Sequence, residues 1–153
     1  MALKTLELIS ILLAAFVGGM FWGPWLALSR SMKTFAPDVF LAIVHRMSPN
    51  MASIMTVMMP LGLLSMIPIL ALSYGRRPAT FYLTLGGFAL FAGALLVTLI
   101  IEVPIVKQIE TWTVRTLPER WWRLRDRWGA FHVVRVATSG AGLLLLVAAA
   151  IYP

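Results

Sequence analysis

The sequence predicts an all-α integral membrane protein built as a four-helix bundle, and composition together with uncharged windows leads to this fold class. Of the 153 residues, 60% are hydrophobic and 12% are charged, whereas about 25% of a typical soluble domain is charged. Four uncharged windows reach the length of about 20 apolar residues that crosses a ~30 Å hydrocarbon layer. A water-soluble globule is therefore excluded, and the crossings must be helices because lipid cannot hydrogen-bond to exposed backbone. The windows run from Leu8 to Leu28, from Met47 to Gly75, from Pro78 to Ile101 and from Val136 to Pro153.

The first span, at about residues 8–28, is predicted to be retained. Its window is longer than the apolar core of a signal peptide, and Gly18 to Trp22 is not a small-residue cleavage site. Gly19 and Gly23 have small-x-x-x-small spacing, which favours close packing within the bundle and leaves homo-oligomerisation as a second interpretation. We expect a single domain over residues 1–153, with the other spans at about residues 51–73, 79–101 and 134–152.

The connection between the first two spans is predicted to contain a short interfacial helix. Apolar residues recur at helical spacing between Thr34 and Met47, and Pro37 is well placed to begin a helix. The run Ser48-Pro49-Asn50 predicts the cap and first turn of the second span. The next connection, from Ser73 to Pro78, predicts a short turn between antiparallel neighbours.

The connection between the third and fourth spans, from Val103 to Phe131, is long and aromatic, and we expect it to fold at the membrane interface. Glu102 ends the third window and is followed by Val103-Pro104. A proline at this position lacks the backbone N–H of a regular helix, so it predicts a bend at the membrane boundary.

The basic residues are distributed unevenly between the two ends of such a bundle. Lys4, Arg76 and Arg77 share one side, and the other ten lysines and arginines share the other. The positive-inside rule then places both termini outside and both longer connections in the cytoplasm, in a multi-pass protein of the cell membrane. The net charge of +7 is thus assigned to topology and to anionic lipid headgroups as a partner, and not to nucleic acid. The ten residues are Arg30, Lys33, Arg46, Lys107, Arg115, Arg120, Arg123, Arg125, Arg127 and Arg135.

One stripe of the last helix gathers side chains that can carry chemistry. Trp121, Arg125, Trp128, His132 and Arg135 follow one another at spacings of 4, 3, 4 and 3 residues. At about 100° per residue they fall within roughly 80° of arc. For the outer members, an aromatic belt with snorkelling arginines is the favoured interpretation.

The end of this stripe supplies candidate catalytic residues together with Glu102. His132 and Arg135 stand at the threshold of an apolar span, where an ionisable group needs a partner or a wet cavity. Glu102 is the acidic residue at the edge of a span on the same side. Glu102 or His132 is a candidate general base, and Arg135 or Arg125 a candidate stabiliser of an oxyanion. The alternative is a structural ion pair that fixes the third and fourth spans.

A second histidine leaves a metal or haem site open as an alternative. His45 is predicted on the same side of the membrane as His132, so the pair could act as axial haem ligands or bind a metal with Glu102. Neither histidine lies in a ligand-spaced motif, and the chain contains no cysteine, so thiolate metal sites are excluded. We expect no metal, and His45 is also a candidate substrate contact.

Methionines on the second span predict an apolar binding wall. Met47, Met51, Met55, Met58 and Met66 share one stripe of about 100°. Methionine adapts to irregular surfaces and to aromatic rings, so the stripe suits a flat apolar ligand, with ordinary bundle packing as the alternative. Met51, Met55 and Met58, with Trp128 and Trp121, are the predicted substrate contacts.

From Glu102 onward the sequence resembles the anthrone oxygenase-like family of small four-helix membrane proteins. The resemblance lies in the acidic residue before Val-Pro, the amphipathic stretch with Ile109 and Trp112, and the stripe that ends at Arg135 before a Leu/Ala-rich last span. It implies oxygenation of an anthrone to an anthraquinone, with no cofactor beyond dioxygen.

The sequence therefore favours a membrane-embedded oxidoreductase, a monooxygenase of a small, flat, apolar substrate that is polyketide-like or quinol-like and binds at the cytoplasmic end of the bundle. Two alternatives remain open at this level. One is a non-catalytic membrane subunit or scaffold whose basic Trp/Arg loop docks a partner or anionic lipid. The other is a small electron carrier that binds haem through His45 and His132.

Overall fold

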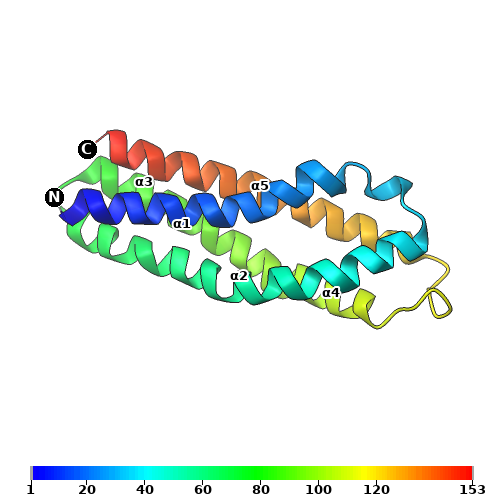
Figure 1. Ribbon diagram of the computed structural model, residues 1–153. Helices are drawn as coiled ribbons and strands as arrows, with labels where there is room; N and C mark the ends of the chain where they lie inside the picture. Colours follow the sequence, from blue (N-terminus) through cyan, green and yellow to red (C-terminus); the bar gives the residue numbers. More distant parts are fainter. Residues whose placement is uncertain (1, 153) are drawn as a thin grey trace.

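The computed structural model describes residues 2–152, and within this range the chain forms an elongated bundle of helices (Figure 1). Four of the helical rods in the described range are long and apolar enough to cross a membrane. The predicted fold class, an all-α four-helix membrane bundle, is confirmed. The rods comprise Ala2–Ser29, Pro37–Ser73, Pro78–Glu110 and Trp121–Ile151.

Two of the rods are not single regular α-helices. The first consists of α1 (Ala2–Pro24) followed by a π-helical turn, Trp25–Ser29. The third consists of α3 (Pro78–Val97), a π-helical turn (Thr98–Glu102) and α4 (Val103–Glu110). The interruption before Pro104 agrees with the predicted disturbance of the third span, because proline leaves a carbonyl one turn back without its usual donor.

The second rod, α2 (Pro37–Ser73), corrects one prediction. Pro37 does begin a helix, but this helix continues without a break through Pro49 into the second span. Ser48-Pro49-Asn50 is therefore helix interior and not a cap. A helix tolerates a proline in its interior when packing against neighbouring segments compensates for the lost hydrogen bond. In α2, Phe40, Leu41 and Val44 are buried by such packing.

The short turn predicted between the second and third spans is confirmed. α2 ends at Ser73 and α3 begins at Pro78. Gly75 has φ 66°, a left-handed conformation that costs little for a residue without Cβ. The chain thus reverses direction in a few residues, and the two chain ends lie together at this end of the bundle (Figure 1).

Two apolar clusters hold the rods together. One fills the middle of the four rods and includes Phe21, Met59, Met66, Phe91 and Leu146. The other joins the start of α2 to α4 and the residues after it. The predicted interfacial segments are thus extensions of the bundle with a core of their own. The members of this second cluster are Met32, Phe40, Leu41, Val44, Ile105, Ile109 and Trp112.

A close approach of two helices lies away from the predicted small-residue motif. A Cβ added at Gly87 of α3 would lie 3.1 Å from Leu146 and 3.2 Å from the carbonyl oxygen of Gly142 on α5 (Trp121–Ile151). No atom lies within 4 Å of the corresponding positions at Gly19 or Gly23. Close packing in the bundle is therefore made at Gly87 and Gly142.

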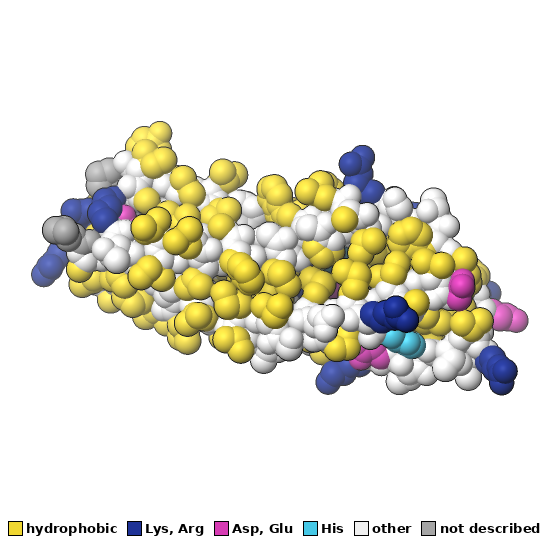
Figure 2. Space-filling model, viewed as in Figure 1, with side chains coloured by type: hydrophobic (Ala, Val, Ile, Leu, Met, Phe, Trp, Pro, Cys, Tyr) yellow, Lys and Arg dark blue, Asp and Glu magenta, His cyan; other side chains and the backbone are white. Residues whose placement is uncertain are grey.

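The outer surface agrees with a membrane environment. Leucine, isoleucine and valine side chains are exposed on every long rod, for example Leu12, Val57, Leu96 and Leu144. Figure 2 shows hydrophobic side chains along the length of the bundle, while charged side chains lie mainly toward its ends. Such a large exposed apolar surface is incompatible with a water-soluble monomer.

Candidate functional site

A cavity of about 360 Å³ lies at the end of the bundle opposite the chain termini. Its wall comes from the end of the first rod, the first half of α2, the segment around Glu102, and α5. Most of the lining is apolar, as is typical of small-molecule sites. Met51 and Met55 line it as predicted, together with Phe40. This cavity is the candidate functional site.

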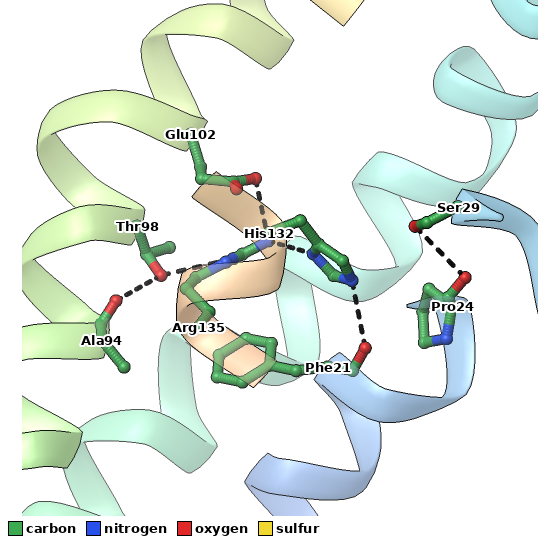
Figure 3. A network of polar contacts seen from close by, with 8 residues as sticks. All are labelled: Phe21, Pro24, Ser29, Ala94, Thr98, Glu102, His132 and Arg135. Carbon is green, nitrogen blue, oxygen red and sulfur yellow. Dashed lines mark hydrogen bonds and ion pairs between the residues drawn. The ribbon is translucent and has the colours of Figure 1, made fainter. Parts of the chain in front are cut away.

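The polar part of the cavity wall is organised around Arg135. Its Nη2 donates to Glu102 Oε2 at 2.8 Å and to His132 Nδ1 at 2.8 Å (Figure 3). Its Nη1 donates to Thr98 Oγ1 at 3.3 Å. The guanidinium carbon lies 4.7 Å from the centre of the Phe21 ring, close enough for a cation–π interaction. One buried cation thus joins three helical rods.

The contacts of His132 define its tautomer. An arginine can only donate, so Nδ1 of His132 accepts from Arg135 and carries no proton. Nε2 lies 3.0 Å from the carbonyl oxygen of Phe21, so it must carry the hydrogen and donate it. His132 is only 2% exposed. Both ring nitrogens therefore have partners, and the imidazole links α5 to α1.

Local helix geometry explains why these residues meet. His132 and Arg135 are three residues apart on α5, so they lie on one face. Thr98 and Glu102 are the first and last residues of the π-helical turn between α3 and α4. A π-helical turn shifts the register of the side chains after it and is frequent at functional sites. Here both of its ends are bonded to Arg135.

Three polar atoms in or beside this network make no hydrogen bond of good geometry within the described residues. They are Glu102 Oε1, an acceptor, and the donors Trp128 Nε1 and Arg135 Nε. The indole N–H of Trp128 nevertheless interacts with the carboxyl group of Glu102, and its ring stacks on His132 with 5.7 Å between ring centres. Buried polar atoms in native proteins are almost always satisfied. Because Glu102 and Trp128 both line the cavity, a polar group of a ligand that inserts between these two side chains would find partners on both.

The structure brings together only part of the predicted site. Glu102, His132, Arg135 and Trp128 line the cavity, with Met51 and Met55 opposite. Arg125 is bound to Asp126 at 3.0 Å and lies over the ring of Trp121 at 5.0 Å, and neither Arg125 nor Trp121 lines the cavity. Trp121 supports the wall from behind through Phe40, at 5.3 Å between ring centres.

Two further candidates lie apart from the cavity. His45 is exposed on α2, and Met58 packs against the central apolar cluster. Residues 2–152 contain no group of three or more histidine, cysteine or acidic side chains that could hold a metal ion. Since the nitrogens of His132 are both engaged, the geometry gives no support to His45 and His132 as a pair of haem ligands.

Thr98 and Phe21 are site residues that sequence reasoning missed. Thr98 precedes Glu102 by four residues, a spacing that places both on one helix face and that could have signalled it. Phe21 contributes a ring and a backbone carbonyl, and nothing in a residue pattern marks a carbonyl as an acceptor. These contacts depend on tertiary packing between distant segments.

The fold and the site together define a small four-span membrane protein with a buried Arg–Glu–His network under an apolar cavity. Residues 49–145, more than half of the chain, match the anthrone oxygenase family. The chain belongs to this family, and the predicted resemblance is confirmed. No curated protein and no solved structure matches the chain.

Proposed function

We propose that this protein is a membrane-embedded oxygenase of a flat, apolar, anthrone-like substrate. The observation that carries the proposal is a donor and an acceptor in the cavity wall that make no hydrogen bond of good geometry, Trp128 Nε1 and Glu102 Oε1. A ligand oxygen that accepts from the indole N–H, next to an acidic hydrogen that faces the carboxylate, satisfies both atoms. Membership of the anthrone oxygenase family and the apolar, methionine-bearing cavity agree with this substrate class.

Glu102 fits the role of general base better than His132. Arg135 binds Oε2 of Glu102 at 2.8 Å, so the carboxyl group is held in place while Oε1 keeps its lone pairs for a proton. His132 has no free nitrogen lone pair because Nδ1 already accepts from Arg135. We therefore assign His132 a positioning role, and Glu102 the removal of a proton from the substrate.

The reaction can be balanced with dioxygen as the oxidant. Glu102 takes one hydrogen of the reacting methylene as a proton, and the electron pair left on the carbon is delocalised to the ring oxygen. This oxyanion accepts the hydrogen bond of Trp128 and lies in the field of Arg135. The electron-rich carbon forms a bond to dioxygen, and cleavage of the O–O bond then leaves a carbonyl on that carbon. The second oxygen atom leaves as water with both methylene hydrogens, and dioxygen is reduced.

We also propose on which side of the membrane the oxygenation takes place. The cavity lies at the end of the bundle that carries most of the arginines and lysines. The positive-inside rule places that end at the cytoplasmic face of the cell membrane, with both chain termini outside. An apolar substrate dissolved in the bilayer would then meet the cavity at the membrane boundary.

The test is oxygen uptake by the purified full chain in mild detergent with an anthrone as substrate. We expect uptake by the wild-type protein and a loss of at least about a hundredfold in Glu102→Gln, which is the usual weight of a general base. Glu110→Gln is the matched control, because Glu110 also lines the cavity but is exposed at its rim. This control is expected to retain activity.

Glu102→Gln leaves Arg135 buried without its anion, so folding is checked by helicity and by size-exclusion profile. Glu102→Asp keeps the charge and withdraws the carboxylate by one methylene, and it is expected to fold and to show reduced uptake. Full uptake by a folded Glu102→Gln variant would overturn the assignment of the base. No uptake by wild type, with anthrones of several substitution patterns, would overturn the proposed activity.

A further inference from the structure

A second, shallower basin of about 330 Å³ lies outside the candidate functional site. Its wall comes from the end of α4, the connection after it and the first two turns of α5. Trp112, Trp121 and Leu124 provide apolar surface, and Arg120, Arg123 and Arg127 provide charge. The remaining lining residues are Gln108 and Pro118.

The charges in this basin are not balanced within the described residues. No acidic side chain of residues 2–152 lines the basin, and the ion pairs found in that range include none for Arg120, Arg123 or Arg127. The neighbouring Arg125 differs, because it is paired with Asp126 at 3.0 Å. The guanidinium of Arg127 lies 5.9 Å from the ring of Phe131, at the outer limit of a cation–π contact. Three like positive charges around one basin favour the binding of an anion there.

The chemistry of the three side chains indicates which anion. Guanidinium groups bind phosphate oxygens through paired, planar hydrogen bonds, and several arginines together are typical of phosphate sites. The basin also lies at the first turn of α5, where no side chain caps the helix and the helix dipole favours an anion, although the N–H groups of Trp121 and Arg123 already donate to the carbonyls of Pro118 and Arg120. We propose that this basin binds the phosphate of an anionic lipid headgroup, independently of any oxygenase activity.

The position of the basin favours a lipid over a soluble phosphate. The helix rises about 10 Å between residue 127 and the predicted start of the span at residue 134, whereas the headgroup layer is about 5–8 Å deep, so the basin lies at the outer edge of that layer. Tryptophans are enriched near the headgroups, and two of them, Trp112 and Trp121, line the basin. The apolar floor would contact the glycerol and upper acyl chain of the same lipid.

The experiment is native mass spectrometry of the full chain released from detergent with equal amounts of dioleoyl phosphatidylglycerol and dioleoyl phosphatidylcholine. We expect the wild type to retain one phosphatidylglycerol in preference to phosphatidylcholine. The variant Arg120→Gln/Arg123→Gln/Arg127→Gln should bind it more weakly by on the order of a hundredfold, at about one kcal/mol for each arginine. If this variant does not fold, the three single variants are compared, each with a smaller loss.

The matched control removes three exposed charges from the same predicted membrane side, as Arg30→Gln/Lys33→Gln/Arg46→Gln. Retention of phosphatidylglycerol by this control, with loss in the basin variant, supports the site. Equal retention by the basin variant and wild type, or equal loss in the control, would overturn it. Orthophosphate is then added as a competitor. Displacement of the lipid by millimolar orthophosphate would overturn the lipid assignment in favour of a soluble phosphate, and persistence supports it.

Discussion

At the scale of single residues, the indole N–H groups of Trp22 and Trp128 differ in their hydrogen bonding. The indole N–H of Trp22 donates to the carbonyl of Val136 at 3.1 Å, which joins α1 to α5. That of Trp128 lies against the carboxyl group of Glu102 and makes no hydrogen bond of good geometry. The same residue type therefore makes a structural bond in one place and is a donor without a well-formed bond, beside a carboxylate, in the other.

Replacing each indole by phenylalanine separates these two roles. Trp22→Phe is expected to lower the free energy of unfolding by about 1 kcal/mol, the usual net value of one hydrogen bond. Trp128→Phe removes a donor that makes no hydrogen bond of good geometry in the folded protein, so stability should change by less than about 0.5 kcal/mol. Thermal unfolding in detergent measures both variants.

Oxygen-uptake activity should be lowered by Trp128→Phe and left unchanged by Trp22→Phe. Trp128→Phe is expected to raise KM, or to lower kcat/KM, by about tenfold because the substrate oxygen loses one hydrogen bond. Trp22→Phe should keep its kcat/KM at temperatures where it is folded. A Trp128→Phe variant with unchanged oxygen-uptake kinetics would contradict the role assigned to its N–H.

Sequence reasoning found the members of the site that have a distinctive residue type at a helical spacing. Glu102, His132, Arg135 and Trp128 are rare, polar or aromatic residues at the edges of apolar spans, and a periodic stripe predicts their common face. The same stripe included Arg125, which instead pairs with its neighbour Asp126. A helical wheel assigns a face, but the competition between partners on that face depends on packing.

At the scale of the secondary-structure elements, the contact between α3 and α5 is set by glycines. Gly87 and Gly142 bring the two backbones together, and a Cβ at Gly87 would meet both Leu146 and a backbone carbonyl. Gly93, one and a half turns further along α3, has no atom within 4 Å of its Cβ position. The two glycines provide a matched comparison within one helix.

Gly87→Ala is expected to lower the free energy of unfolding by about 1–3 kcal/mol, because a backbone carbonyl cannot move aside as a side chain can. Gly93→Ala should be neutral, or stabilising by up to about 1 kcal/mol through helix propensity. Denaturation of both variants in the same detergent checks this. Equal stability of the two variants would show that the helices do not approach as described.

The element boundaries were predicted less well than the elements. Uncharged windows locate the apolar centre of each span, yet they miss its continuation into segments that contain charges. α2 continues back to Pro37 because the second apolar cluster buries Phe40, Leu41 and Val44 against α4. That cluster joins residues about 65 positions apart in the sequence, so no local sequence pattern predicts it. Pro49, which lies inside α2, therefore predicts a helix boundary that the structure does not have.

At the scale of the whole molecule, the charge distribution predicts an orientation. Figure 1 places both chain ends at the same end of the bundle, and Lys4, Arg76 and Arg77 lie in the segments there. The other ten basic residues belong to the opposite half. This asymmetry applies to short connections near the spans, which is where the positive-inside rule holds.

Reporter fusions test that orientation in intact cells. An alkaline phosphatase domain, which is active only outside, should be active when fused to either terminus and inactive when inserted after Arg115. A reporter protein that fluoresces only when it lies in the cytoplasm should be bright when it is inserted after Arg115, in the exposed turn between α4 and α5. Phosphatase activity at that insertion point and not at the termini would mean that the cavity faces outward.

The 37 residues of α2 have a further consequence. A helix of that length measures about 55 Å, well beyond the ~30 Å of hydrocarbon. The cavity is lined by the half of α2 nearer Pro37, so a bilayer around the spans would border this wall with both its hydrocarbon and its headgroup layer. In the proposed oxygenation, the reactant and the product differ in polarity, and each would exchange with the layer that dissolves it better.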